Sequence, residues 1–185
     1  MALLDRDESV LVVVDAQPGF LPAEVEPAVE RMAWLVAVAA RLAIPVVVTE
    51  EEPDRNGATD ARVAERLPAG APVFTKPTFG LAGTPEILEA VRATGRGTIV
   101  VVGCETDVCV AQSAVGLQAA GFTCVVVEDA TFSPGEMHER GLARLGSEGV
   151  ARNHTKGVTY EWLRTVEDAH VVLRGPGLPS APFKL

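Results

Sequence analysis

The chain has 185 residues and a formal net charge of −9, with a sequence pI of about 4.8. This length fits one domain with a full core, so we expect residues 1–185 to form a single unit. The acidic balance argues against nucleic acids and anionic membranes as partners, and a hydrophobic fraction of 48% with only 5% aromatic residues favours a core of Val, Ala and Leu.

Short apolar runs bounded by turn residues predict five buried strands, at residues 10–14, 44–49, 73–75, 98–102 and 122–127. Helical periodicity or helix-start signals lie between and after these runs, at residues 27–42, 84–93, 109–121 and 136–145. Strands that alternate with helices predict an α/β fold whose parallel sheet has right-handed crossovers.

The remaining segments carry weaker signals. Residues 50–70 are polar, contain several helix and strand breakers, and predict a loop. We interpret residues 158–160 as a short sixth strand and residues 161–169 as a final helix. The Pro- and Gly-rich residues 174–185 predict an extended tail that lies over the surface or across a neighbouring subunit.

The start of the chain and its cysteines bear on location. The first eight residues are acidic and lack the apolar stretch of a secretory leader, and no apolar run is long enough to span a bilayer. Three cysteines without a CxxC pair indicate reduced thiols. We therefore expect a cytoplasmic protein that is not associated with membranes.

Cys109 is the candidate nucleophile. It follows the strand at 98–102 through the segment Gly103-Cys104-Glu105-Thr106-Asp107-Val108 and opens the next helix. A helix N-terminus favours negative charge on a nearby side chain and lowers a thiol pKa from about 8.5. We expect Cys109 to be an anionic sulfur at neutral pH.

Two further residues at predicted strand ends would complete this chemistry. Asp15 follows the first strand and Lys76 follows the third. The carboxyl ends of parallel strands meet at one edge of a sheet, where ligands bind. There Lys76 would stabilise the thiolate, and Asp15 would take the thiol proton and later deliver it to a departing amine.

Three segments together resemble the isochorismatase-like cysteine hydrolases, a superfamily that includes isochorismatases, nicotinamidases and N-carbamoylsarcosine amidase. They are Val-Val-Asp-Ala-Gln-Pro-Gly-Phe at 13–20, Thr-Lys-Pro-Thr-Phe-Gly at 75–80, and Gly-Cys-Glu-Thr-Asp-Val-Cys-Val at 103–110. The resemblance covers about residues 8 to 130. It implies a three-layer αβα fold with a six-stranded, mainly parallel sheet of Rossmann-like order, and a homo-oligomer, either a dimer or a tetramer.

The resemblance also implies the site. Its catalytic Asp-Lys-Cys set maps to Asp15, Lys76 and Cys109. Its oxyanion hole maps to the backbone N–H groups of Glu105 and Cys109, and its non-proline cis peptide to the bond between Cys104 and Glu105.

Metal ligands are missing at the position where related enzymes carry them. Metal-dependent nicotinamidases have an Asp-x-His pair after the second strand, where this chain has Thr-Glu-Glu-Glu-Pro at 49–53. The three histidines, at 138, 154 and 170, are widely spaced and lie in the last third of the chain. We expect no catalytic metal, which argues against nicotinamidase activity. No GxGxxG follows the first strand, and we expect no cofactor.

Candidate pocket residues surround the three strand ends: Gln17, Phe20, Glu50, Phe79 and Val110. The two phenylalanines and the valine would be either apolar walls of a substrate site or ordinary core residues. The acidic residues 50–52 fit a solvated run, with Glu50 facing the pocket as the second interpretation.

These features favour a metal-independent cysteine hydrolase of a small amide, carbamoyl or imide-like compound, acting through a Cys109 thioester. One alternative is an isochorismate-like vinyl-ether hydrolase in which Asp15 is the acid and the cysteine is dispensable. Another is a non-catalytic protein that binds ligands or senses oxidants through the Cys109 thiol. The expected partner is a small-molecule substrate.

Overall fold

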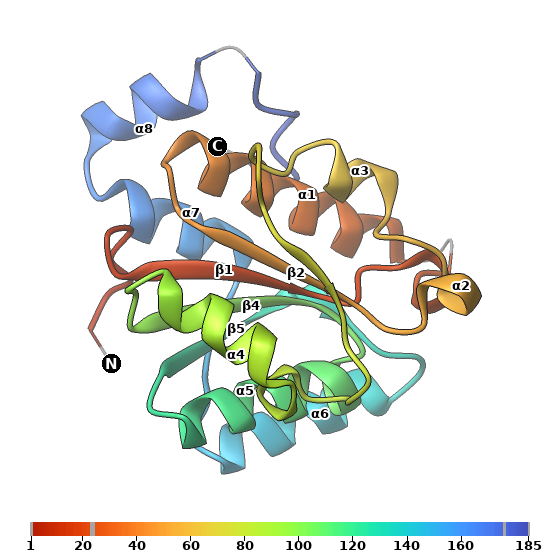
Figure 1. Cartoon of the computed structure of the whole chain (residues 1–185). Helices are drawn as coiled ribbons and strands as arrows, with labels where there is room; N and C mark the ends of the chain where they lie inside the picture. The colour runs from red at the N-terminus through yellow and green to blue at the C-terminus, as the bar shows by residue number, and fades with distance from the viewer. Residues whose placement is uncertain (1, 23–24, 176, 185) are drawn as a thin grey trace.

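The computed structural model describes residues 2–22, 25–175 and 177–184. Within them, six strands form one sheet in which every neighbouring pair is parallel and the order is β3-β2-β1-β4-β5-β6 (Figure 1). The strands are β1 (Ser9–Val14), β2 (Val46–Glu50), β3 (Val73–Thr75), β4 (Thr98–Cys104), β5 (Thr123–Phe132) and β6 (Ala151–Asn153). This is the strand order of doubly wound Rossmann-type folds, which confirms the predicted fold class.

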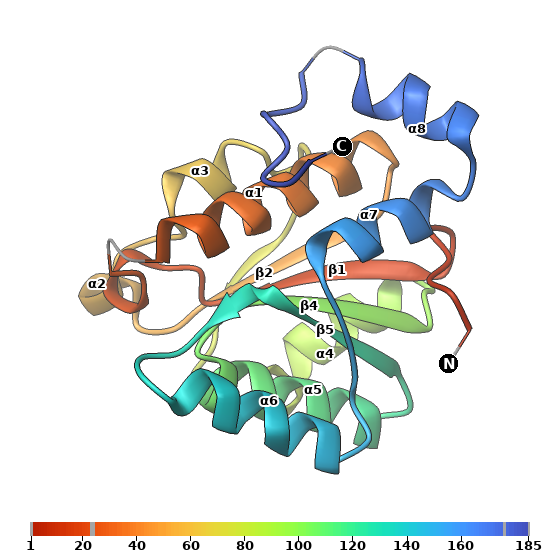
Figure 2. The ribbon, with the colours of Figure 1, turned by 180° about the vertical axis from the view of Figure 1, so that it is seen from behind.

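Helices cover both faces of the sheet. Helices α1 (Glu26–Arg41) and α7 (Thr155–Leu163) pack on one face, with α3 (Ala61–Ala64) beside α1 and α8 (Val166–Leu173) beside α7. Helices α4 (Pro85–Ala93), α5 (Ala111–Ala119) and α6 (Met137–Ser147) cover the other face (Figures 1 and 2). None of the helices among the described residues combines the length and the apolar character that a membrane crossing requires.

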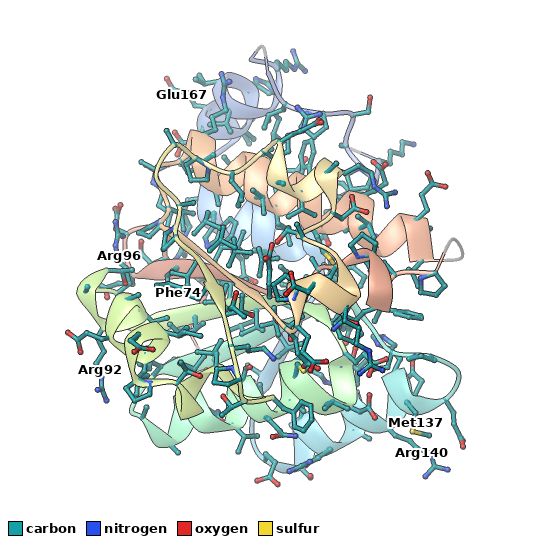
Figure 3. All side chains as sticks on the ribbon, turned by 45° about the vertical axis from the view of Figure 1, so that its right-hand side comes forward. Phe74, Arg92, Arg96, Met137, Arg140 and Glu167 are labelled. Atoms are coloured by element: carbon teal, nitrogen blue, oxygen red, sulfur yellow. The ribbon has the colours of Figure 1, made fainter. Side chains whose placement is uncertain are left out.

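The two faces explain why the strand segments are continuous apolar runs. In β1, Leu11 and Val13 pack with the α1 side, while Val10, Val12 and Val14 pack with the side of α4 and α5, and all five are fully buried. A strand covered on both faces cannot alternate apolar with polar residues. Charged side chains lie on the outside of the helices instead, as Arg92 of α4 and Arg140 of α6 show (Figure 3).

The C-terminal third differs from the sequence prediction. Residues 158–160, predicted as a strand, belong to α7, and the sixth strand is Ala151–Asn153. The reason is that Val158 and Trp162, four residues apart, are both fully buried on one face of a helix. The predicted helix 161–169 is split at Arg164, whose φ is 65°, and α8 starts after it.

Two further segments differ in smaller ways. The predicted loop 50–70 contains two short helices, α2 (Pro53–Asn56) and α3, the second capped by Asp60, whose carboxylate accepts a hydrogen bond from the backbone N–H of Arg62. Strand β5 continues to Phe132, beyond the predicted end at 127. The segment that carries Cys109 begins as a π-helical turn, η4 (Thr106–Val110), before α5.

The C-terminal tail packs against its own chain. Residues 175 and 177–184 form neither helix nor strand, while residues 176 and 185 of the predicted tail lie outside the described residues. The ring of Phe183 meets Trp34 of α1 edge-on, with ring centroids 5.5 Å apart, and Lys156 of α7 donates to the carbonyl of Lys184 at 2.7 Å. The tail therefore runs past α1 and α7 (Figure 2).

The close approach of β4 to β1 generates a stability prediction. Gly103 pairs with Val14 and has a φ of 121°, and a Cβ atom on it would overlap the carbonyl oxygen of Val14. We expect Gly103→Ala to lower the free energy of unfolding by more than about 3 kcal/mol, because an unfavourable backbone conformation and a clash add up. Urea denaturation measures this loss.

Gly95→Ala is the matched control. Gly95 also has a positive φ, 69°, but a Cβ there would meet open space. The control is expected to lose only about 1–2 kcal/mol. Equal losses in the two variants would show that the contact between the strands has no effect.

Candidate active site

Three side chains from neighbouring strand ends converge at the carboxyl edge of the sheet. Asp15 is the first residue after β1, Lys76 is the first after β3, and Cys109 lies in η4, which follows β4. The Nζ atom of Lys76 is 2.7 Å from Oδ2 of Asp15 and 3.5 Å from Sγ of Cys109. The side chains of Asp15 and Lys76 are fully buried, and Cys109 is 4% exposed. The structure thus brings the three candidate catalytic residues together.

The backbone turn before α5 sets the position of Cys109. The peptide bond between Cys104 and Glu105 is cis, as the family resemblance implies. The carbonyl of Glu105 then accepts hydrogen bonds from the N–H groups of Val108 at 3.2 Å and Val110 at 3.0 Å. These bonds close the turn and place Cys109 two residues before the start of α5 at Ala111.

Two side chains that follow β5, Ser133 from the connecting segment and His138 from α6, hold this turn from outside. Ser133 donates a hydrogen bond of 2.6 Å to the carboxylate of Asp107 and accepts one of 3.3 Å from its backbone N–H. The hydroxyl of Thr106 lies 2.9 Å from Nδ1 of His138. The nucleophile turn is therefore fixed on two sides.

Asp15 is held between a hydroxyl group and the buried ammonium. Its Oδ1 accepts a hydrogen bond of 2.9 Å from the hydroxyl of Thr49. Its Oδ2 forms the close ion pair with Lys76 but receives no directed hydrogen bond. Burial raises the pKa of Asp15 above its ordinary value, although the nearby ammonium partly offsets this effect.

Lys76 is the cation of the site. Burial by itself would lower the pKa of Lys76, but attraction to Asp15, Cys109 and Glu51 raises it above its ordinary value. The ammonium also donates to the carbonyl of Thr78 at 3.1 Å. Lys76 is therefore charged throughout the neutral pH range.

Glu51 is a fourth member that the sequence reasoning missed. Its Oε2 lies 3.2 Å from Sγ of Cys109 and 3.4 Å from Nζ of Lys76. Glu51 is the first residue after β2, the place that Asp15 and Lys76 occupy after their own strands. In the sequence this signal leads only to the acidic run 50–52, because the predicted strand ends at residue 49 and puts Glu50 in that place.

Glu50, one residue earlier, has a structural role instead. Its Oε1 accepts hydrogen bonds of 2.7 Å from both the backbone N–H and the hydroxyl of Thr59. The interpretation in which Glu50 faces the pocket is therefore wrong. Neighbouring residues along a strand point to opposite faces, so Glu51 points where Glu50 does not.

Gln17 positions Glu51 rather than lining the pocket. It is fully buried, and its amide oxygen accepts from the backbone N–H of Glu51 at 2.7 Å. Its amide nitrogen donates to the carbonyl of Glu51 at 3.0 Å and to that of Gly57. Asn56 donates to the same carbonyl of Glu51 at 2.8 Å.

A surface pocket of about 660 Å³ opens beside the cluster. Of the three residues whose place was left between wall and core, only Phe79 lines this pocket, and it is 54% exposed. Val110 is fully buried in the core, and Phe20 packs against the core on the α1 side. The other lining residues are Glu51, Glu52, Arg55, Thr75, Lys76, Pro77 and Thr78.

The structure contradicts the expected lowering of the pKa of the Cys109 thiol. Burial raises the pKa of Cys109 above its ordinary value, and the charge of Asp15 and the hydrogen bond to Glu51 raise it further, while Lys76 lowers it only in part. The prediction of a lowered pKa is wrong because burial disfavours the thiolate and, beyond that, two carboxylates face the sulfur against one ammonium. In the free protein Cys109 is a thiol at neutral pH.

The same groups bear on metal binding. One donor atom from each of Asp15, Glu51 and Cys109 lies within 4.8 Å of the others, a spacing that suits a metal ion. The Lys76 ammonium is 2.7–3.5 Å from all three, however, and would repel a divalent cation placed among them. These residues therefore fit an ammonium better than a metal.

Comparisons with known proteins bear on the family of the chain. The isochorismatase domain matches residues 9–152. The chain is 36% identical over 153 residues to isochorismatase domain-containing protein 1 of Danio rerio, covering 77% of this chain and 50% of the relative, so it spans half the length of that protein. It is 28% identical over 134 residues to the probable hydrolase YcaC of Escherichia coli, covering 69% and 64% of the two chains.

Two solved structures share the fold. The crystal structure of Escherichia coli YcaC, described as an octameric hydrolase of unknown specificity, superposes with a TM-score of 0.86 at 22% identity, covering 94% of this chain and 88% of that one. YcaC from Pseudomonas aeruginosa, with hexane-2,5-diol and covalent acrylamide, superposes with a TM-score of 0.79 at 26% identity, covering 92% and 89%.

The raised thiol pKa predicts how Cys109 reacts with an alkylating agent. Because the folded protein favours the neutral thiol, the thiolate fraction grows with pH until the pH reaches the raised pKa. We expect the alkylation rate of Cys109 by iodoacetamide to rise about tenfold per pH unit from pH 6 to 9, with no plateau. Mass spectrometry of the Cys109 peptide measures the rate. A plateau below pH 8 would contradict this prediction.

Proposed function

The chain belongs to the isochorismatase family, and we propose that it is a metal-independent cysteine hydrolase of a small amide, carbamoyl or imide-like compound. Its kinship with proteins described as hydrolases supports the reaction class. The observation that carries the proposal is the contact of one buried ammonium with both the Cys109 sulfur and the Asp15 carboxylate, beside an open pocket.

In the proposed reaction, Sγ of Cys109 attacks the substrate carbonyl carbon while Oδ2 of Asp15 takes the thiol proton. The new S–C bond moves the carbonyl electrons onto oxygen, where the backbone N–H groups of Glu105 and Cys109 would stabilise the charge. Asp15 then gives its proton to the departing nitrogen as the C–N bond breaks. Water attacks the resulting thioester, releases the acid product and restores the thiol.

The raised pKa of Cys109 makes proton transfer part of the attack. A neutral thiol is a weak nucleophile, so the proton has to leave as the S–C bond forms. Asp15 suits this role because a carboxylate oxygen lies within 4.8 Å of Sγ of Cys109 and burial raises the pKa of its carboxyl, which favours uptake of a proton. Lys76 would neutralise the negative charge that passes between the two groups.

The thiol environment also separates catalysis from oxidant sensing. Redox-sensing cysteines are accessible and have a low pKa. Cys109 is 4% exposed, and burial raises its pKa. These properties favour a nucleophile that is activated by a bound substrate over a thiol that reacts with dilute oxidants.

The charges of the pocket favour an amide over an isochorismate-like vinyl ether. Glu51 and Glu52 line the pocket, and among the described lining residues the cations are Lys76 and Arg55. Lys76 is paired with Asp15 at 2.7 Å and Arg55 with Glu52 at 3.4 Å. A substrate with carboxylate groups would meet uncompensated negative charge there.

Assembly and location are part of the same proposal. Escherichia coli YcaC is described as octameric, and we expect this chain to form a homo-oligomer as well. The acidic charge and the free cysteines support a cytoplasmic location.

An ammonia-release screen over small primary amides and ureido compounds, together with chromatography of the ring-opened products of cyclic imides, tests the activity. We expect Cys109→Ala to lower the rate on the best substrate by at least about a thousandfold, because no thioester can form. Cys124→Ala is the control, since Cys124 is buried inside β5 away from the cluster, and it should keep the wild-type rate. Full activity of Cys109→Ala would refute the thioester route and favour Asp15 acting as an acid alone.

Metal removal gives a second test. We expect EDTA-treated enzyme to hydrolyse the same substrate at an unchanged rate, because Lys76 supplies the positive charge next to the sulfur. The rate is measured before and after dialysis against EDTA, with Zn²⁺ or Mg²⁺ added back in a separate arm. Activity that disappears with EDTA and returns with a metal would contradict the mechanism.

A further inference from the structure

Glu51 has no part in the proposed reaction, yet it touches both the nucleophile and its cation. We propose that Glu51 is the residue that recognises the substrate: its Oε2 holds the Cys109 thiol in the free enzyme and exchanges it for an N–H group of the bound substrate. The inference rests on the proposed function and narrows its substrate to an acyl compound that bears an N–H donor, such as a primary amide or a ureido group.

Hydrogen bonds to its backbone fix the position of Glu51. Its backbone N–H and carbonyl are both bonded to the amide of Gln17, which is fully buried, and the carbonyl also accepts from Asn56. The carboxylate can therefore point to the sulfur, 3.2 Å away, without depending on a mobile backbone. None of these anchoring bonds uses the carboxylate, so changing the side chain leaves the anchor in place.

The two carboxylates near the sulfur differ in what can reach them. Asp15 is fully buried and is not among the residues that line the pocket. The Glu51 side chain is 20% exposed and lines it. A substrate entering the pocket therefore reaches Glu51, while the Asp15 carboxylate is closed off from the pocket.

The chemistry favours the exchange of partners. A thiol is a weak hydrogen-bond donor, whereas an amide N–H forms a stronger, charge-assisted bond with a carboxylate. When the substrate takes Oε2 of Glu51, the thiol proton loses that acceptor and becomes available to Asp15. A compound without an N–H group offers the carboxylate no donor in place of the thiol, so the carboxylate keeps its contact with Lys76 but gains none from the ligand. This disfavours binding of such a compound relative to an amide.

Two electrophiles, one with an N–H donor and one without, test the inference without any catalytic turnover. Acrylamide carries an NH₂ group and methyl acrylate does not, but a thiol adds to the same terminal alkene carbon of each. The S–C bond forms, the alkene electron pair moves to the carbon next to the carbonyl, and that carbon receives the thiol proton. The measured quantity is the ratio of the Cys109 modification rates, acrylamide over methyl acrylate, relative to the same ratio for N-acetylcysteine.

For the wild-type protein we expect this relative ratio to be about 10 to 100. That is the factor by which one hydrogen bond to a charged group changes an equilibrium or a rate. Glu51→Met should bring the ratio close to one. The same variant should react with methyl acrylate about tenfold faster than wild type at pH 7, because a negative charge next to the sulfur has been removed. Glu51→Gln, which keeps the shape of the side chain, should give an intermediate ratio.

The matched control is Glu65→Met. Glu65 is an exposed carboxylate at the end of α3 and is not among the residues that line the pocket. It has no contact with the sulfur among the described interactions, so this variant should keep the wild-type ratio. Cys109→Ala measures the background from the two buried cysteines, Cys104 and Cys124.

The outcomes separate this inference from the proposed function. An unchanged ratio in both Glu51 variants would overturn the role of Glu51, even if the ammonia screen finds an amide substrate. A ratio that collapses while no amide is hydrolysed would overturn the proposed function and leave Glu51 as a ligand-recognition residue. If Glu51→Met does not fold, as judged by circular dichroism, the ratio of Glu51→Gln alone decides.

Discussion

The site depends on one buried positive charge. The ammonium of Lys76 is removed from water, and a buried charge is tolerated only when it is paired and hydrogen-bonded. Asp15, Glu51, Cys109 and the carbonyl of Thr78 surround it at 2.7–3.5 Å. Three neighbouring strands end at these acidic and basic groups, so the strand order of the sheet decides which charges meet. The acid–base chemistry of the pocket follows from these contacts between charged groups.

Much of this arrangement could be predicted from the sequence, because it depends on where buried strands end. The runs at 10–14, 73–75 and 98–102 mark the ends after which Asp15, Lys76 and Cys109 lie. The family resemblance drawn from three short segments is confirmed by the domain match. Strand Ala151–Asn153 was missed because three residues, two of them polar, have no recognisable periodicity.

Two features of the site could not be predicted, for different physical reasons. Choosing between Glu50 and Glu51 requires the register of β2, and a shift of one residue turns a side chain to the opposite face. The sign of the shift in the Cys109 pKa depends on burial and on the number of carboxylates that face the sulfur, which are tertiary properties. The helix-start rule considers only the local backbone, and here the tertiary terms outweigh it.

The bonds made by Gln17 have a consequence for how such a pocket can change. They tie the segment after β1 to the segment after β2, so the two carboxylates keep one fixed geometry. The pocket is also lined by Pro77 and Phe79, whose side chains take no part in the described hydrogen bonds, although the backbone carbonyl of Thr78 between them accepts a hydrogen bond from Lys76. Substitutions of Pro77 and Phe79 alone can therefore change which ligands bind, while the catalytic side chains stay in place.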